Sequence, residues 1–267
     1  MLFALPFPAI DPVLISFGPF VIRWYALAYI GGLLLGWRYM RALAAKAPAA
    51  GKPEDIDDFL VWATLGVVLG GRLGYILFYR PGYYLANPLE ILAVWQGGMS
   101  FHGGILGVTV AGILFVRRRG IAILPFADRL ACAAPLGLLF GRIANFINGE
   151  LWGRAADVSW AVVFPRGGPV PRHPSQLYEA ALEGALLFAI LYVLQRRDGV
   201  RARPGVLTGV FVAGYALARM TGEMFREPDA YIGFLPFGTT WGQWLSLPML
   251  AIGLVLIVSA VRKGTPA

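Results

Sequence analysis

Long apolar runs alternate along the chain with short polar and basic segments. A helix that crosses a bilayer needs about 20 mostly apolar residues. Runs near that length predict an all-α, polytopic integral membrane protein with about seven transmembrane helices. The predicted spans are approximately residues 19–37, 59–79, 91–116, 121–141, 176–195, 204–225 and 240–261.

The third predicted span is too long for one straight helix. It contains two glycine pairs, Gly97–Gly98 and Gly103–Gly104. Because glycine adopts backbone conformations that other residues avoid, these pairs predict a break or a re-entrant turn within the span.

Basic residues fix the predicted orientation, because short cytoplasmic loops carry an excess of Lys and Arg. If the chain crosses seven times, the basic segments that follow spans one, three, five and seven lie on the same side. The C-terminus is then cytoplasmic and the N-terminus external. These basic residues are Arg38, Arg41, Lys46, Lys52, Arg117, Arg118, Arg119, Arg196, Arg197, Arg201, Arg203, Arg262 and Lys263.

The longest connection between predicted spans covers about residues 142–174. It is too long for a plain turn, and it contains the turn-forming cluster Pro165–Pro169. We therefore expect a small extracytoplasmic cap here, within a single membrane-embedded domain of residues 1–267.

Composition supports a membrane protein. The chain is 58% hydrophobic and only 14% charged, whereas soluble domains carry about 25% charged residues. A single cysteine, Cys132, excludes an internal disulfide framework. The net charge of +8 is accounted for by attraction to anionic lipid on the cytoplasmic side, so it does not require a nucleic-acid partner.

Ionisable residues inside apolar spans are the most informative positions. Each costs at least about 2.5–3.5 kcal/mol at mid-bilayer, so each requires a partner and an aqueous cavity. One interpretation is a set of structural ion pairs, which we favour for Asp128 and Arg129. The eight residues are Arg72, Arg129, Arg142, Arg219, Asp128, Glu179, Glu183 and Glu223.

Two of these arginines indicate a binding site. Arg142 and Asn145 share a helical face at positions i and i+3, with Gly149 one turn further on. A guanidinium beside an amide, with glycine allowing close approach, suits an anionic, oxygen-rich lipid headgroup. Arg219 and Glu223 are spaced i and i+4 in the weaker Arg-before-Glu orientation, so mutual pairing alone explains them poorly.

The two histidines are candidates for proton transfer, since histidine normally titrates near neutral pH. For His102 a general base and a hydrogen-bonded interhelical histidine remain equally open. His173 precedes Pro174 and is better explained as a helix cap or loop anchor. With one cysteine and two distant histidines, we expect no metal site.

Other functional classes fit the same features. A transporter or lipid scramblase would also bury arginines and use glycine-broken helices. A purely structural membrane subunit would leave the Arg–Asn–Gly cluster and His102 without a purpose.

Several motifs together resemble one family, the bacterial prolipoprotein diacylglyceryl transferases. The resemblance runs through most of the chain. Its longest motif, the fourteen-residue signature, is Gly141–Arg154. The motifs are Trp24–Ala26, Gly70–Tyr75, Ser100–Gly104, Gly141–Arg154, His173–Glu179 and Arg219–Asp229.

The resemblance implies an enzyme of the bacterial cell membrane, the inner membrane where the organism has two. Its lipid donor would be phosphatidylglycerol, and its acceptor would be the lipobox cysteine thiol of a prolipoprotein that still carries its signal peptide. The sn-1,2-diacylglyceryl group would form a thioether as glycerol-1-phosphate leaves. No metal or organic cofactor is implied.

The resemblance also implies roles for individual residues. Arg142 with Asn145 would hold the phosphate, and Arg219, fixed by Glu223, would orient it or stabilise its departure. His102 would be the base that activates the thiol.

The remaining implied site residues would position or admit the substrate. Tyr25 would supply a positioning hydroxyl, and Glu150 and Arg154 would pair to brace the signature. The glycines that would admit the glycerol and phosphate are Gly103, Gly104 and Gly153.

Overall fold

The computed structural model describes residues 4–8, 10–18, 20–228 and 233–263. These residues are mostly helical, which confirms the predicted helical class. The chain divides into two compact units, one formed by residues 1–40 and 127–267 and the other by residues 41–126. Each unit is described here by itself.

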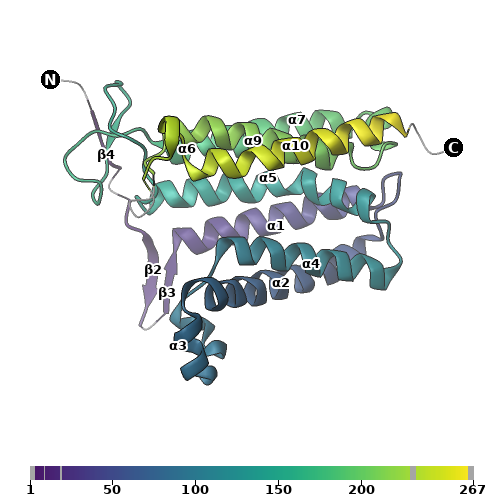
Figure 1. The fold of residues 1–267 in the computed structure, drawn as a ribbon, viewed down its shortest axis with the longest axis horizontal. Coiled ribbons are helices and arrows are strands. Elements are labelled where there is room, and N and C mark those ends of the chain that lie inside the picture. Colours follow the sequence, from purple (N-terminus) through teal and green to yellow (C-terminus); the bar gives the residue numbers. More distant parts are fainter. Residues whose placement is uncertain (1–3, 9, 19, 229–232, 264–267) are drawn as a thin grey trace. The chain divides into compact units, whose positions relative to one another are not determined.

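The first unit contains long helices, an antiparallel pair of strands β2 and β3, and a short parallel pair of strands β1 and β4 (Figure 1). Glycines allow close packing within it: Gly32 of α1 faces Gly137 of α5, and Gly209 of α9 faces Gly253 of α10. Its elements are β1 (Leu5–Pro6), β2 (Val13–Phe17), β3 (Phe20–Arg23), α1 (Trp24–Ala44, up to residue 40), α5 (Ile123–Ile147, from residue 127), β4 (Val162–Val163), α6 (Ser175–Glu179), the π-helical segment η3 (Ala180–Leu186), α7 (Leu187–Gln195), α8 (Asp198–Arg201), α9 (Val206–Glu223), η4 (Pro236–Gly238) and α10 (Trp241–Arg262).

The second unit is built on two helices that lie side by side, α2 (Pro53–Tyr79) and α4 (Phe101–Arg119) (Figure 1). The helix α3 (Pro81–Ala86) and the 3₁₀ turns η1 (Pro88–Leu92) and η2 (Val94–Gln96) connect them. A Cβ atom at Gly103 or Gly107 of α4 would overlap the carbonyl oxygen of Gly70 or Gly66 in α2. Small residues therefore bring these two backbones into direct contact.

The predicted break in the third span is confirmed. Gly97 and Gly98 have φ angles of +85° and +75°, which glycine adopts readily, and α4 begins only at Phe101. The Ser100 hydroxyl caps the new helix by accepting a hydrogen bond from the Gly103 amide at 3.2 Å. His102 consequently lies in the first turn of α4 and not near the middle of a long span.

Arg72 of α2 stabilises the segment before this break. Its side chain is buried, and its guanidinium donates to the carbonyl oxygens of Ile91 at 2.9 Å and Gly97 at 2.6 Å. It also donates to the Glu90 carbonyl at 2.5 Å. Arg72 thus provides hydrogen-bond donors for backbone carbonyls in a segment of short 3₁₀ turns, where no regular α-helix pairs them.

The exposed and buried faces of the helices are reversed relative to a soluble protein. In α10 the buried residues are Ser246, Gly253 and Ala260, while large residues such as Leu254 and Val255 are exposed. A surface of this kind is stable against lipid but not against water. By length and composition, four helical segments among the described residues could cross a membrane: Pro53–Tyr79, Ile123–Ile147, Ser175–Gln195 and Trp241–Arg262.

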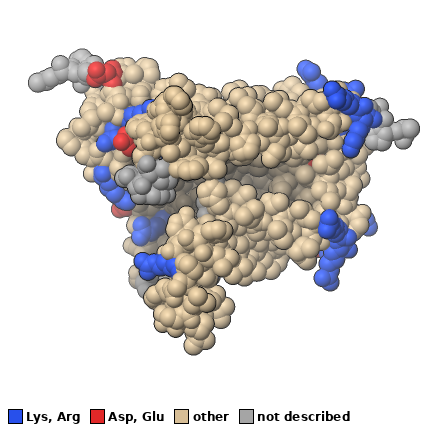
Figure 2. All heavy atoms as spheres, in the orientation of Figure 1, with Lys and Arg blue, Asp and Glu red and all other residues tan. Residues whose placement is uncertain are grey.

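The other three predicted spans contain the helices α1, α4 and α9, which are less apolar. Figure 2 shows basic side chains of the first unit at the end where α10 finishes, with mainly uncharged helix faces between the two ends. The structure also shows that residues 142–147 of the predicted cap are the last turns of α5, so the irregular segment begins after Ile147.

Asp128 has a structural role as a helix cap, which the expectation of an ion pair with Arg129 did not include. Its buried carboxylate accepts hydrogen bonds from the Gly205 amide at 2.8 Å, the Thr208 amide at 2.7 Å and the Thr208 hydroxyl at 2.6 Å. These donors lie at the start of α9, where backbone amides otherwise lack partners.

We expect Asp128→Ala to lower the free energy of unfolding by roughly 1–3 kcal/mol, because it leaves buried donors unpaired. Thermal unfolding in detergent measures this, with the exposed Asp157→Ala as the matched control. Equal unfolding temperatures for the two variants would contradict the capping role.

Candidate active site

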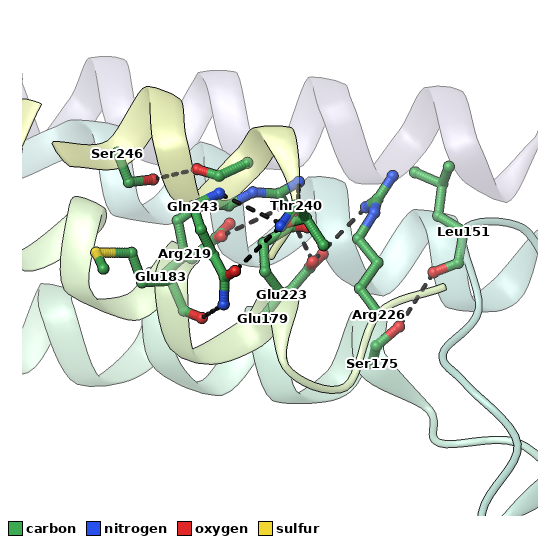
Figure 3. A network of polar contacts seen from close by, with 12 residues as sticks. Leu151, Ser175, Glu179, Glu183, Arg219, Glu223, Arg226, Thr240, Gln243 and Ser246 are labelled. Atoms are coloured by element: carbon green, nitrogen blue, oxygen red, sulfur yellow. Dashed lines mark hydrogen bonds and ion pairs between the residues drawn. The ribbon is translucent and has the colours of Figure 1, made fainter. Parts of the chain in front are cut away.

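The first unit contains a buried cluster of arginine and glutamate side chains, contributed by α5, α6, η3, α9 and the residues that follow α9. Figure 3 shows the members from α6, η3, α9 and the residues after α9. Its members are Arg142, Glu179, Glu183, Arg219, Glu223 and Arg226. Three guanidinium groups thus face three carboxylates in a segment of predominantly apolar helices.

Arg142 lies near the end of α5, and its helical geometry places it on the same face as Asn145, as predicted. Its Nη1 lies 2.9 Å from Glu179 Oε2. Its Nε and Nη2 both donate to Glu183 Oε2, at 3.1 and 3.0 Å. Arg142 therefore joins two carboxylates from the neighbouring helix.

Glu179 and Glu183 are completely buried. They are four residues apart at the junction of α6 and η3, where the chain forms a π-helical segment. Such segments are rare and frequently occur at functional sites. A buried carboxylate is stable only when it is paired with a cation, so both residues depend on the arginines.

Arg219 extends the cluster from α9. Its Nη1 lies 3.0 Å from Glu179 Oε1 and 3.8 Å from Glu183 Oε1. It also forms an ion pair with Glu223, one turn further along α9. Arg226 approaches Glu179 Oε1 at 3.6 Å, so Glu179 contacts three arginines.

Two glycines make space for the carboxylates. A Cβ atom at Gly242 would overlap the Glu223 side chain, and one at Gly222 would lie 3.2 Å from Glu179 Cγ. Gly242 belongs to the first turn of α10, which Thr240 caps. The Glu223 carboxylate therefore also lies beside the positive end of a helix dipole.

A small pocket of about 60 Å³ lies beside the cluster. Its lining includes Arg219 and Arg226, but among the described lining residues Arg142 is absent. The lining residues are Arg219, Glu223, Arg226, Pro228, Gly233, Thr240, Trp241 and Gly242. Two of the three cluster cations thus border open space that an anionic group could enter.

The segment after α5 folds against the cluster. Glu150 accepts hydrogen bonds from the Asn145 side chain at 2.9 Å and the Asn148 side chain at 3.3 Å. Its backbone carbonyl accepts from the Gln176 side chain at 2.6 Å. These contacts connect the signature to the beginning of α6.

Tyr25 lies in the first turn of α1, and its hydroxyl donates to the Tyr29 hydroxyl at 3.1 Å. It interacts electrostatically with Glu150. Tyr25 therefore lies near the signature segment, in the same unit as the arginine cluster.

Comparison with known proteins decides the family. A model of the family described as prolipoprotein diacylglyceryl transferase matches residues 12–259. Three relatives named phosphatidylglycerol–prolipoprotein diacylglyceryl transferase are similar over nearly their whole length. The one from Paramagnetospirillum magneticum is 62% identical over 268 residues, covering 100% of both chains. Those from Gluconacetobacter diazotrophicus and Rhodospirillum rubrum are 60% and 61% identical, covering 98% of this chain and 95% and 96% of theirs.

The chain belongs to the prolipoprotein diacylglyceryl transferase family. The resemblance inferred from the motifs is thereby confirmed. Of the site residues that it implied, the structure brings together Arg142, Arg219 and Glu223 in one cluster, with Asn145 and Glu150 in contact beside it. His102, Gly103 and Gly104 belong to the second unit.

The predicted pair between Glu150 and Arg154 is corrected by the structure. Arg154 donates instead to the backbone carbonyls of Glu223 and Arg226, both at 2.9 Å. Glu150 turns to the asparagines of its own segment. The spacing of i and i+4 favours pairing only within a helix, and residues 150–154 are not helical. Arg154 still braces the signature, against the end of α9.

The expected role of two glycines is also corrected. A Cβ atom at Gly153 would lie within 2.7 Å of Phe225 O, His173 O and His173 Cβ, so protein backbone fills the space that substrate was expected to use. The space beside Gly103 is filled in the same way by the backbone of Gly70. Both glycines permit close packing of chain segments. Gly104 has ordinary contacts with Val67 and remains a candidate.

His173 is a loop anchor, as expected. Its amide donates to the Arg154 carbonyl at 3.0 Å and its carbonyl accepts from the Gly153 amide at 2.9 Å. Its Nδ1 lies 3.1 Å from the Tyr178 hydroxyl. Partial burial lowers the pKa of His173, which favours a neutral ring at pH 7.

Four residues of the site were not predicted as site residues. The spacing of Glu179 and Glu183 could have indicated that they belong to the site, because two carboxylates at i and i+4 in an apolar span require partners. Arg226 lies within the motif Arg219–Asp229, which gave it no role of its own. Tyr215, one turn before Arg219, also interacts electrostatically with Glu183 and both arginines, Arg142 and Arg219. A tyrosine in an apolar helix does not by itself indicate a functional site.

Proposed function

We propose that this protein transfers the sn-1,2-diacylglyceryl group of phosphatidylglycerol to the lipobox cysteine thiol of a prolipoprotein. This would be the first step of bacterial lipoprotein maturation. The observation that carries the proposal is 62% identity over the full chain with a relative named for these two substrates. The acceptor still carries its signal peptide and is therefore held at the membrane.

The reaction replaces a carbon–oxygen bond with a carbon–sulfur bond. The thiol loses its proton, because the thiolate is the attacking species. The thiolate attacks the glyceryl carbon that bears the phosphate, and glycerol-1-phosphate leaves with the bonding electrons. Nothing is oxidised or reduced, and the proposal needs no metal or organic cofactor.

The arginine cluster would act on the phosphate. Negative charge on this group increases as it leaves, so fixed cations that face it lower the barrier. Arg142 with Asn145 would hold the phosphate, and Arg219, fixed by Glu223, would orient it or stabilise its departure. The pocket lined by Arg219 and Glu223 supports the role of Arg219, and the contacts of Arg142 with Glu179 and Glu183 connect it to the same cluster.

Tyr25 would position the lipid through its hydroxyl. Its electrostatic interaction with Glu150 of the signature supports this role. Glu150 and Arg154 would maintain the signature segment, each through the contacts described above.

We further propose seven transmembrane helices, with the N-terminus external, the C-terminus cytoplasmic and residues 148–174 forming an external cap on a single membrane domain. The basic residues at the ends of α4 and α10 support this orientation. The membrane would be the bacterial cell membrane, and the inner one where two are present.

A direct assay tests the proposed reaction. Purified protein is incubated with phosphatidylglycerol and a lipobox peptide, and the peptide is analysed by mass spectrometry. We expect a mass increase of one diacylglyceryl group. Lipid movement across vesicles without any adduct would refute the proposal and indicate a transporter or scramblase.

His102 would be the base that removes the thiol proton. We expect His102→Gln to lower the transfer rate by about 10²- to 10⁴-fold, the usual contribution of general base catalysis. The variant should regain rate as the pH rises towards the thiol pKa of about 8.5, because the thiol then ionises without help. Rates measured from pH 6 to 9 against wild type test this, and near-normal turnover by the variant at pH 7 would place the base elsewhere.

A further inference from the structure

The arginine–glutamate cluster is formally neutral before any lipid enters it. Arg142, Arg219 and Arg226 carry three positive charges, and Glu179, Glu183 and Glu223 carry three negative charges when ionised. Figure 3 shows all of these residues except Arg142. The phosphodiester of phosphatidylglycerol adds one further negative charge. In a poorly hydrated site, an uncompensated charge is expensive.

The arginines cannot respond to this change, because a guanidinium neither gains nor loses a proton in proteins. The carboxylates can respond by binding a proton. The protein therefore has a means to keep the occupied site neutral, provided that one glutamate is held less tightly than the others.

The contacts distinguish the three glutamates. Both oxygens of Glu179 lie within 3.0 Å of an arginine nitrogen. Glu223 pairs with Arg219 and lies against the first turn of α10. Glu183 instead uses only Oε2, which accepts from Nε and Nη2 of Arg142.

The other oxygen of Glu183, Oε1, is buried and has no hydrogen-bond partner among the described residues. Oε2 of Glu179 also lacks a hydrogen bond of good geometry, but it lies 2.9 Å from Nη1 of Arg142. The nearest cation is Arg219, whose Nη1 lies 3.8 Å away, beyond hydrogen-bonding distance. A phosphate that attracts Arg142 and Arg219 would weaken both contacts of this carboxylate. Glu183 is thus the group on which a proton is accommodated most readily.

We propose that Glu183 takes up one proton when the phosphate of the anionic lipid enters the cluster. This inference rests on the proposed function, because it assumes that the cluster binds the phosphate of phosphatidylglycerol. The charged and titratable groups that face Glu183 are Arg142 from α5, Glu179 from α6, and Tyr215 and Arg219 from α9. Glu223 and Arg226 adjoin them through Arg219 and Glu179.

Proton uptake makes lipid binding dependent on pH. Where free Glu183 is ionised and bound Glu183 is protonated, the linkage relation predicts that affinity rises about tenfold for each unit by which the pH falls. A ligand without the phosphate charge should show no such dependence.

Calorimetry of lipid binding tests the inference. Short-chain phosphatidylglycerol is titrated into the full-length protein in detergent, in two buffers of equal pH and different ionisation enthalpies. The difference in heat gives the number of protons taken up, and we expect about one per lipid bound. Short-chain diacylglycerol, which lacks the phosphate, should give none.

Glu183→Gln resembles the protonated carboxyl group, so this variant should bind phosphatidylglycerol with no proton uptake and with affinity that is independent of pH. The control is Glu227→Gln, at a half-exposed residue paired with Arg172, which should keep the wild-type proton count. Uptake that persists in Glu183→Gln would overturn the assignment to Glu183.

If Glu183→Gln does not fold, calorimetry on the wild-type protein alone still tests the inference. Binding and transfer without proton uptake in wild type would refute the inference and leave the proposed function intact. Failure of wild type to bind phosphatidylglycerol would refute both.

Discussion

Replacing Arg142 with alanine should abolish diacylglyceryl transfer while the protein still folds and inserts. Loss of a preorganised donor to a developing negative charge lowers rates by about 10²- to 10³-fold, and Arg142 would provide both charge and two parallel donors. Its removal leaves Glu183 without its main partner, but a carboxyl group can become neutral by binding a proton. Product formation with a lipobox peptide, followed by mass spectrometry, measures the loss.

Arg142→Lys is the matched variant for this prediction. Lysine keeps the charge but cannot make the forked contact with two carboxylates, so we expect activity between that of alanine and wild type. Gel filtration and thermal unfolding in detergent show whether each variant is folded. Near-normal turnover by a folded Arg142→Ala protein would exclude its role at the headgroup.

Glu179→Ala should produce the largest loss of stability. Glu179 is fully buried and lies within 3.6 Å of Arg142, Arg219 and Arg226. Its removal leaves three cations around one vacated position, and arginine cannot lose its charge. Breaking a buried ion pair typically costs about 3–5 kcal/mol, and we expect a loss of this size in the free energy of unfolding, together with loss of transfer.

Thermal and denaturant unfolding in detergent measure this effect, with Glu227→Ala as the control. Glu227 is half-exposed and pairs with Arg172 at 3.1 Å, so its removal should cost at most about 1 kcal/mol. Glu179→Gln separates charge from shape, since it keeps an oxygen acceptor of the same size. Similar stability for wild type and Glu179→Ala would show that Glu179 does not hold the arginines in place.

The local features of this protein could be predicted from its sequence. The helical class follows from apolar runs, and the break before α4 follows from Gly97 and Gly98, because both depend on neighbouring residues. The shared face of Arg142 and Asn145 follows from the period of the α-helix. The family followed from motifs that contain these same residues.

Contacts between distant segments could not be predicted in the same way. The spacing of Glu150 and Arg154 suggested a pair, but Arg154 instead reaches backbone carbonyls about seventy positions away. Gly153 and Gly103 were expected to admit substrate, and their space is filled by chain segments from elsewhere in the sequence. Glycine content indicates that something approaches closely, but it does not indicate what approaches.

By itself the sequence determined that the chain forms apolar helices, that charged residues lie within them, and that its motifs are those of a lipid-modifying transferase. Only the tertiary structure decided that Glu179 is shared among three arginines and that one oxygen of Glu183 has no hydrogen-bond partner among the described residues. The physical reason is that helix formation and hydropathy depend on adjacent residues. The pairing of buried charges depends instead on which helices pack together and at which turn.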